Sequence, residues 1–102
     1  MSGTIEVSPQ RRWSAASWLF DWTVGYLADQ VTDEKLAAEL REIVDENLGW
    51  LGLDDYGPDA RADLVAILRD RIVPAAAVDL PGTVDDRPAV LALLRELADA
   101  TG

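Results

Sequence analysis

The apolar residues of this chain recur at intervals of three and four positions in four segments, which is the spacing of one face of an α-helix. We therefore predict helices over residues 14–31, 33–48, 58–73 and 87–100. No window alternates apolar and polar residues clearly enough to predict a β-strand. The expected fold is a single all-α domain spanning residues 1–102. It is a four-helix bundle with an irregular N-terminal segment and a proline-containing connector between the third and fourth helices.

Residue types that favour helix ends support these boundaries. Ser14 is the expected N-cap of the first helix, and Thr32 or Asp33 is that of the second. Pro58 suits the first turn of the third helix. Pro74 is expected to end or kink that helix, because proline lacks a backbone N–H.

The first predicted helix has two apolar stripes on roughly opposite sides. One stripe consists of Ala16, Phe20, Val24, Leu27 and Val31, and the other consists of Trp18, Trp22 and Tyr26. A surface helix needs only one such stripe, so we expect both sides of this helix to be covered. The aromatic stripe is either buried within the bundle or covered by a partner. Tryptophan and tyrosine dominate interface hot spots, so the composition of this stripe favours the interface.

A carboxylate interrupts the aromatic stripe, because Asp29 falls by angle between Trp18 and Trp22. If the stripe is buried, this carboxylate needs a partner. Arg71 in the third predicted helix is the candidate. We expect Asp29 and Arg71 either to pair or to lie together at the edge of a hydrated interface. The alternative is that Arg71 extends into solvent.

The composition narrows the classes of function. The chain has no cysteine, so it forms no disulfide or thiolate metal site, and a reducing cytoplasm is the expected compartment. It also has no histidine, the usual general base at neutral pH, so we expect a protein that is not an enzyme. Its net charge of −10 repels nucleic acid and anionic membranes and attracts basic partners.

Acidic residues gather on the second predicted helix and in the loop that follows it. Glu39, Glu42 and Glu46 share one helix face, and Asp54 and Asp55 lie in the loop. Such residues either form a solvated surface or steer a basic partner toward the protein.

An alternative function comes from a family resemblance. The pairs Glu39-x-x-Glu42 and Glu96-x-x-Asp99 resemble the ExxE and ExxD motifs of the all-α nucleotide pyrophosphatases. That resemblance implies an enzyme whose helix carboxylates hold Mg²⁺, an ion that accepts oxygen ligands without histidine.

The carboxylates and the aromatic stripe together favour a small, acidic protein-binding protein of bacterial type. An inhibitor, an immunity or antitoxin-like factor, or an adaptor that engages a basic partner protein fits this description. We expect no catalytic residue, metal or cofactor, and no nucleic-acid or membrane partner. A homodimer formed through the aromatic stripe is a further alternative. The expected partner-binding residues are Trp18, Trp22, Tyr26, Asp29, Glu39, Glu42, Glu46, Asp54 and Asp55.

Overall fold

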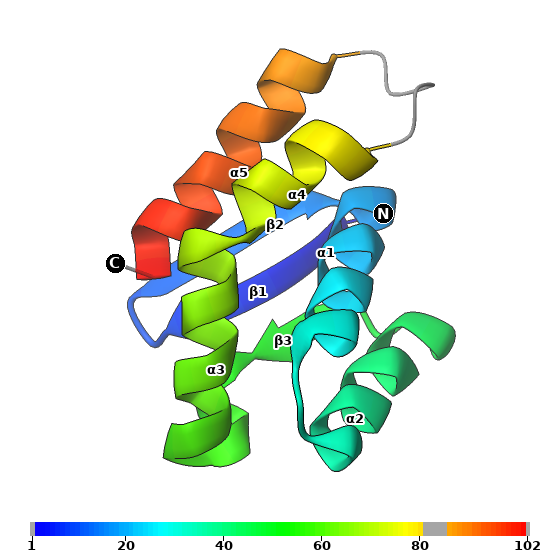
Figure 1. Ribbon diagram of the computed structural model, residues 1–102, viewed down its shortest axis with the longest axis vertical. Helices are drawn as coiled ribbons and strands as arrows, with labels where there is room; N and C mark the ends of the chain where they lie inside the picture. Colours follow the sequence, from blue (N-terminus) through cyan, green and yellow to red (C-terminus); the bar gives the residue numbers. More distant parts are fainter. Residues whose placement is uncertain (1, 81–85, 102) are drawn as a thin grey trace.

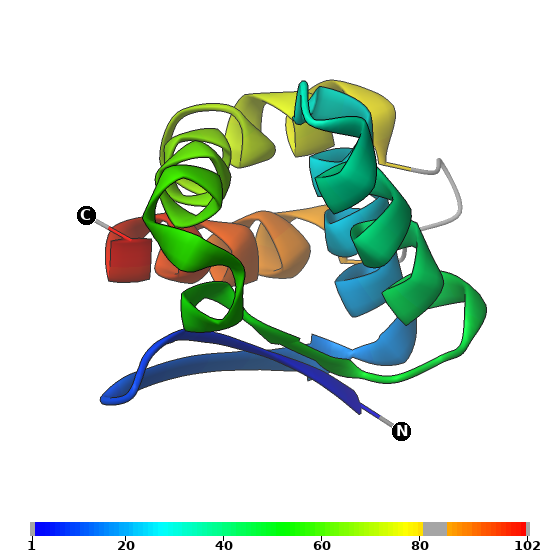
Figure 2. The ribbon, with the colours of Figure 1, turned by 90° about the horizontal axis from the view of Figure 1, so that it is seen from below.

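The computed structural model describes residues 2–80 and 86–101, which form a three-stranded sheet and five α-helices packed over one face of it (Figures 1 and 2). The elements are β1 (Ser2–Ser8), β2 (Arg11–Ala16), α1 (Ser17–Gln30), α2 (Glu34–Asp45), β3 (Trp50–Gly52), the 3-10 helix η1 (Leu53–Tyr56), α3 (Gly57–Asp70), α4 (Ile72–Asp79) and α5 (Arg87–Thr101). The predicted all-α four-helix bundle is therefore wrong, and the fold is mixed α/β.

The sheet has the strand order β2-β1-β3, with β1 in the centre. β1 and β2 form an antiparallel hairpin in which Ile5 lies opposite Trp13. β3 pairs with β1 in parallel, and Leu51 lies beside Ile5 on the other side. These three side chains are buried beneath the helices. The β1–β3 connection contains α1 and α2, as a parallel pair requires a crossover.

The hairpin replaces the irregular segment predicted before Pro9. On β1, Gly3, Ile5 and Val7 are buried, whereas the side chains between them are more exposed. This alternation is weak in the sequence because one inward position is a glycine. A Cβ at Gly3 would lie only 2.1 Å from Cγ of Phe20, so helix α1 sits directly on the strand there.

The first helix also begins later than predicted. Ser14 is not an N-cap but belongs to β2, where its Oγ lies 2.9 Å from Oγ1 of Thr4 on the neighbouring strand. Helix α1 starts at Ser17 after Ala16, which provides no side-chain cap. Helix α2 follows the sequence rule more closely, because Asp33 caps it by accepting from the backbone N–H groups of Lys35 and Leu36.

The third predicted helix ends earlier than expected, and a further helix, α4, occupies most of the first half of the predicted connector. Pro58 lies in the first turn of α3, as expected. α3 ends at Asp70, and α4 begins at Ile72 with Pro74 in its first turn, where the missing N–H costs no helical hydrogen bond. The break at Arg71 turns the chain back toward α1, which matters for the site described below (Figure 1).

One cluster of buried apolar side chains fills the space between the sheet and the helices. Phe20 of α1, Leu64 of α3 and Leu94 of α5 are each at most 1% exposed in this cluster. Trp13 is 5% exposed, and its indole Nε1 donates to the carbonyl oxygen of Leu93 at 2.8 Å. This bond satisfies the one polar atom of the ring and ties β2 to α5.

Candidate functional site

Helix α1 carries both predicted apolar stripes, and the structure gives them different surroundings. Phe20, Val24 and Leu27 are buried in the core. Trp22 and Tyr26 on the other stripe are only half-buried, so they pack against the core with part of each ring exposed to solvent. The aromatic stripe therefore forms part of the surface of the isolated chain.

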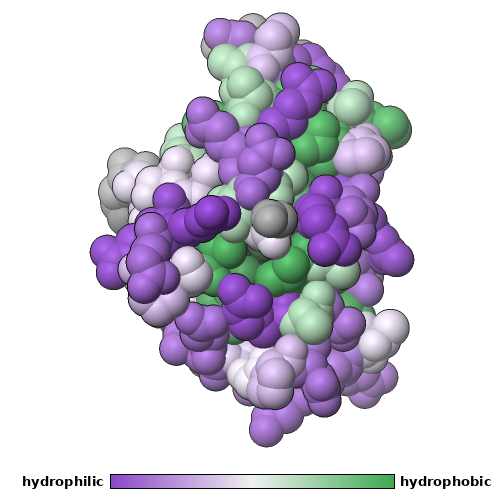
Figure 3. Space-filling view, turned by 90° about the vertical axis from the view of Figure 1, so that its left-hand side faces the viewer, coloured by the Kyte–Doolittle hydropathy of each residue, from purple (hydrophilic) through white to green (hydrophobic). Residues whose placement is uncertain are grey.

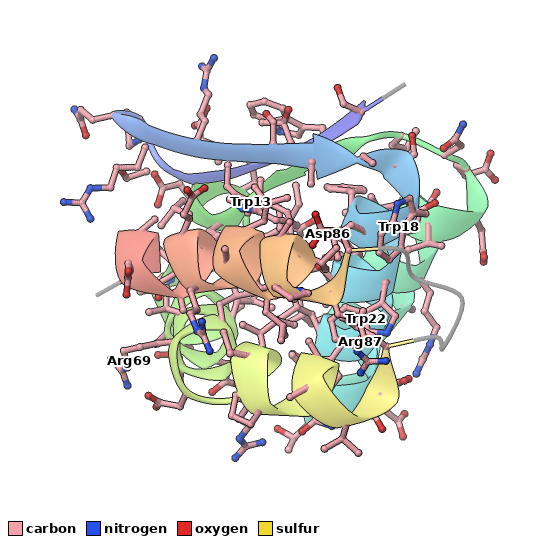
Figure 4. The ribbon with its side chains drawn as sticks, turned by 90° about the horizontal axis from the view of Figure 1, so that it is seen from above. Trp13, Trp18, Trp22, Arg69, Asp86 and Arg87 are labelled. Carbon is pink, nitrogen blue, oxygen red and sulfur yellow. The ribbon has the colours of Figure 1, made fainter. Side chains whose placement is uncertain are left out.

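A groove of about 470 Å³ lies along this stripe, between α1, α2 and the C-terminal end of α4. We call it the acidic groove. Figure 4 shows Trp22 on α1 close to the C-terminal end of α4. The residues that line the acidic groove are Asp21, Trp22, Gly25, Tyr26, Asp29, Arg41, Val44, Asp45 and Asp79.

The two aromatic rings in the groove are stacked on each other. Trp22 and Tyr26 are one helical turn apart, and their rings are nearly parallel, with an interplanar angle of 6° and centroids 5.7 Å apart. Both residues line the groove, so the pair contributes partly apolar aromatic surface to it. Such a surface can pack against another planar group or against a cation.

Charge in the groove is strongly one-sided. Among the described residues, four aspartates and a single arginine line it, which is a formal excess of three negative charges. The one cation, Arg41, donates from Nη2 to Oδ1 of Asp29 at 3.4 Å, and both side chains are more than half exposed. An exposed ion pair of this length contributes little to stability, so it neutralises the groove only weakly.

Of the two arrangements expected for Asp29 and Arg71, the direct pair is not formed. Asp29 turns toward Arg41 of α2, while Nη1 of Arg71 donates to the side-chain oxygen of Gln30 at 3.2 Å. Asp29 lines the acidic groove, whereas Arg71 and Gln30 line a separate depression. Asp29 does belong to the groove that contains Trp22, as its position on the aromatic stripe suggested.

The remaining predicted residues are distributed over other surfaces. Trp18 is 45% exposed and is not among the residues that line the groove. Glu42 on α2 and Glu46, which directly follows this helix, are exposed. Asp54 has a structural partner, because it accepts from Nε of Arg61 at 2.8 Å, and the same guanidinium donates to the carbonyl oxygen of Val7 at 2.9 Å. This contact joins η1, α3 and β1.

Glu39 and Asp55 lie together at a smaller depression of about 290 Å³ that Tyr56 also lines. Burial of the Tyr56 ring raises the pKa of its hydroxyl, and the charges of Glu39 and Asp55 raise this pKa further. The hydroxyl is therefore protonated at neutral pH and can donate a hydrogen bond, but it is unsuited to act as a base.

The carboxylates of the magnesium alternative are not brought together. Glu39 and Glu42 lie on α2, whereas Glu96 and Asp99 lie on α5, at the opposite side of the molecule (Figure 1). Within residues 2–80 and 86–101 no group of three or more acidic, histidine or cysteine side chains could hold a metal ion. The geometry therefore gives no support to a pyrophosphatase-like centre.

Several groove residues were not identified from the sequence as site residues. Asp21, Asp45 and Asp79 come from three different helices, and only the folded chain brings them to one place. Gly25 did carry a signal, because an isolated glycine inside a helical pattern often has a packing or functional reason. Asp79 carried none, since α4 was read as part of a connector.

The side of the molecule away from α1 and α2 has a different character. It is viewed directly in Figure 3, where hydrophilic side chains cover most of the surface and smaller hydrophobic areas lie between them. This mixture is typical of a solvated surface. Across the described part of the chain, no helix has both the length and the apolar composition needed to span a membrane.

Comparison of the chain with models of known protein families, with curated proteins and with solved structures finds no match. Any function assigned to the chain therefore depends on the site itself.

Proposed function

We propose that this protein binds another protein, and that a basic segment of the partner docks in the acidic groove. The observation that carries the proposal is the excess of aspartates around the stacked rings of Trp22 and Tyr26. The charges steer a basic partner over long range, and the rings supply contact area at short range. An inhibitor, an immunity or antitoxin-like factor, or an adaptor in the cytoplasm would use such a site.

Charge also favours a basic partner over a second copy of this chain. A homodimer formed groove to groove would bring two sets of four aspartates together, and each chain already carries a net charge of −10. Like charges at an interface oppose association. We therefore expect a monomer at physiological salt by size exclusion with light scattering. A dimer that Trp22→Ala converts to monomer would favour the homodimer instead.

The proposal is tested by selecting a library of random peptides on the purified protein. Bound peptides should be enriched in arginine and lysine, and their affinity should fall as salt is raised. The triple variant Asp21→Asn/Asp45→Asn/Asp79→Asn removes three groove charges and should weaken the selected peptides by at least about tenfold, because each lost charge-assisted contact is worth more than a neutral one.

The matched control removes three charges from exposed positions outside the groove, as Asp63→Asn/Glu96→Gln/Asp99→Asn. It should change the affinity of the same peptides by less than about threefold, because exposed distant charges are screened. Equal losses in the two triple variants would mean that only overall charge matters. Selected peptides without basic residues, or no selected peptide at all, would also contradict the proposal.

A further inference from the structure

Gly25 lines the acidic groove at a position that the described residues leave open. It lies in the middle of α1, and apart from the helix itself no heavy atom of residues 2–80 and 86–101 lies within 4 Å of the place where a Cβ would be. Its φ is not positive, since only Gly49 and Gly57 have positive φ among the described glycines. Alanine would therefore fit here, and it would be the better helix former.

The other described glycines have reasons within the chain. Gly49 and Gly57 have φ values of 68° and 77°, which other residues rarely adopt. A Cβ at Gly3 would overlap Phe20, and one at Gly52 would lie 2.6 Å from Oδ2 of Asp55. Gly25 alone in this group lacks such a reason, so we look for one outside the chain.

Three of the groove aspartates also lie at positions where an acidic side chain is unfavourable for the stability of its own helix. Asp29 is next to last in α1, and Asp45 and Asp79 are the last residues of α2 and α4. The C-terminal end of a helix carries partial negative charge and favours basic residues, yet the last turns of these three helices contain none. A cation bound in the groove would relieve this repulsion.

Three of the four groove aspartates also have no basic partner among the described residues. Within residues 2–80 and 86–101, Asp21, Asp45 and Asp79 are not within 4.0 Å of any lysine or arginine nitrogen, and Arg41 reaches only Asp29. The groove thus combines an open position over Gly25, the stacked rings of Trp22 and Tyr26, and carboxylates at the C-terminal ends of three helices.

We propose that the acidic groove is a seat for a guanidinium group, supplied by an arginine side chain of the partner and placed over Gly25. This inference rests on the proposed function and names the group that the groove recognises. A guanidinium is planar and stacks on an aromatic surface, and its five N–H donors can reach several carboxylates at once. A lysine ammonium is more strongly hydrated and lacks the flat face, so it fits the ring pair less well.

The test uses three acetylated and amidated Gly/Ser peptides that differ only in one central residue, which is arginine, lysine or citrulline. Citrulline keeps the planar shape of arginine but has no charge. Each peptide is titrated at low salt into the protein, with amide chemical shifts as the measurement. We expect the arginine peptide to shift α1 and α2 amides around Gly25 and to bind at least about threefold more tightly than the lysine peptide. The citrulline peptide should give no saturable shift.

Gly25→Ala tests the seat itself. Its methyl group should occupy the open position and weaken the arginine peptide by at least about threefold, while the better helix former raises the melting temperature by roughly 3 to 6 °C. A gain in stability with a loss of binding is a result that a purely structural role would not give. Asp99→Asn, near the end of α5 and outside the groove, is the control and should leave peptide binding unchanged.

The outcomes separate this inference from the proposed function. If the lysine peptide binds as tightly as the arginine peptide, or if Gly25→Ala binds arginine normally, the guanidinium seat is wrong and a basic partner in the groove still stands. If no cationic peptide shifts the groove amides, the seat is wrong, and the proposed function then depends on the library selection alone. If that selection also fails, both are wrong.

Discussion

Trp22 and Trp50 both lie at the surface among charged side chains, but among the described residues only Trp50 has a cation over its ring. Trp50 is on the outer face of the sheet, and the guanidinium carbon of Arg12 lies 5.6 Å from its ring centroid. Nε of Arg12 also donates to Glu6 at 3.0 Å. The chain itself therefore provides a ring, a guanidinium and a carboxylate in contact.

In the acidic groove the same set is incomplete. Trp22 has a stacked ring partner and carboxylates nearby, but Arg41 contacts Asp29, and no cation of the described residues lies over the Trp22 ring. The comparison shows that this chain can place one of its own guanidinium groups over a surface tryptophan. On the sheet the interaction is complete within the chain, whereas in the groove the proposed guanidinium of a partner would be the cationic member.

The largest expected effect comes from the core that supports both tryptophans. Phe20 is 1% exposed and sits against Gly3, between α1 and the sheet. Phe20→Ala should lower the free energy of unfolding by about 3 to 5 kcal/mol, because it leaves a cavity between these layers. Urea unfolding measures this loss. Trp22→Ala is the comparison, and it should cost less than about 2 kcal/mol because its ring is only partly buried. Equal costs would show that the aromatic stripe belongs to the core.

Gly25→Arg supplies the missing cation from the chain itself. It should raise the free energy of unfolding by about 1 to 2 kcal/mol, from better helix propensity and from attraction to the groove aspartates. It should also weaken binding of the arginine peptide by at least about tenfold, since the seat is then filled and the charge reduced.

Gly25→Glu is the matched control for this change, because glutamate and arginine have similar helix propensities. The difference in stability between the two variants isolates the effect of charge in the groove. If Gly25→Glu is as stable as Gly25→Arg, the carboxylates around Trp22 do not act as an unfilled cation site, and the contrast with Trp50 fails.

The sequence allowed the helices to be predicted better than the sheet, for physical reasons. Leu36, Leu40 and Ile43 repeat at helical spacing, and their stripe is buried in α2. The first two strands show no clear alternation of apolar and polar residues, so they were not predicted. The inward position Gly3 has no side chain, and Ala15 and Ala16 are both small and apolar. β3 has only three residues, too few for any alternation to be visible.

The residues of the acidic groove could also be predicted only in part from the sequence. Helical spacing places Trp22, Tyr26 and Asp29 on one side of α1, and all three line the acidic groove, whereas Trp18 does not. Asp45 and Asp79 were not predicted as site residues, because their approach to Trp22 depends on how α2 and α4 cross α1. Periodicity describes one helix at a time, so a groove formed by three helices can be recognised only in the folded chain.

Arg12→Gln tests the sheet side of the comparison, and a smaller effect is expected. It removes the cation over Trp50 and the ion pair with Glu6, and both contacts are partly exposed to solvent. We expect a loss of about 0.5 to 1 kcal/mol in the free energy of unfolding, less at high salt. Binding of the arginine peptide should be unchanged. A loss of binding would mean that the outer sheet face, rather than the groove, takes the ligand.

The smallest effect on stability is expected at Tyr56, a third aromatic ring that has carboxylates nearby. Burial, with the charges of Glu39 and Asp55, raises the pKa of its hydroxyl above 10.0 in the folded chain. Between pH 10.0 and this raised pKa, the unfolded chain loses the tyrosine proton while the folded chain keeps it. Stability should therefore fall as the pH rises through this window, and less so in Tyr56→Phe.

Absorbance of ionised tyrosine during an alkaline titration, together with urea unfolding at several alkaline pH values, measures this effect. Glu39→Gln should lower the pKa of Tyr56 part of the way toward its usual value, because only one of the three causes is removed. Should Tyr56→Phe lose stability as steeply as the unmodified chain, burial and the neighbouring carboxylates would not raise the pKa of the Tyr56 hydroxyl in the folded chain.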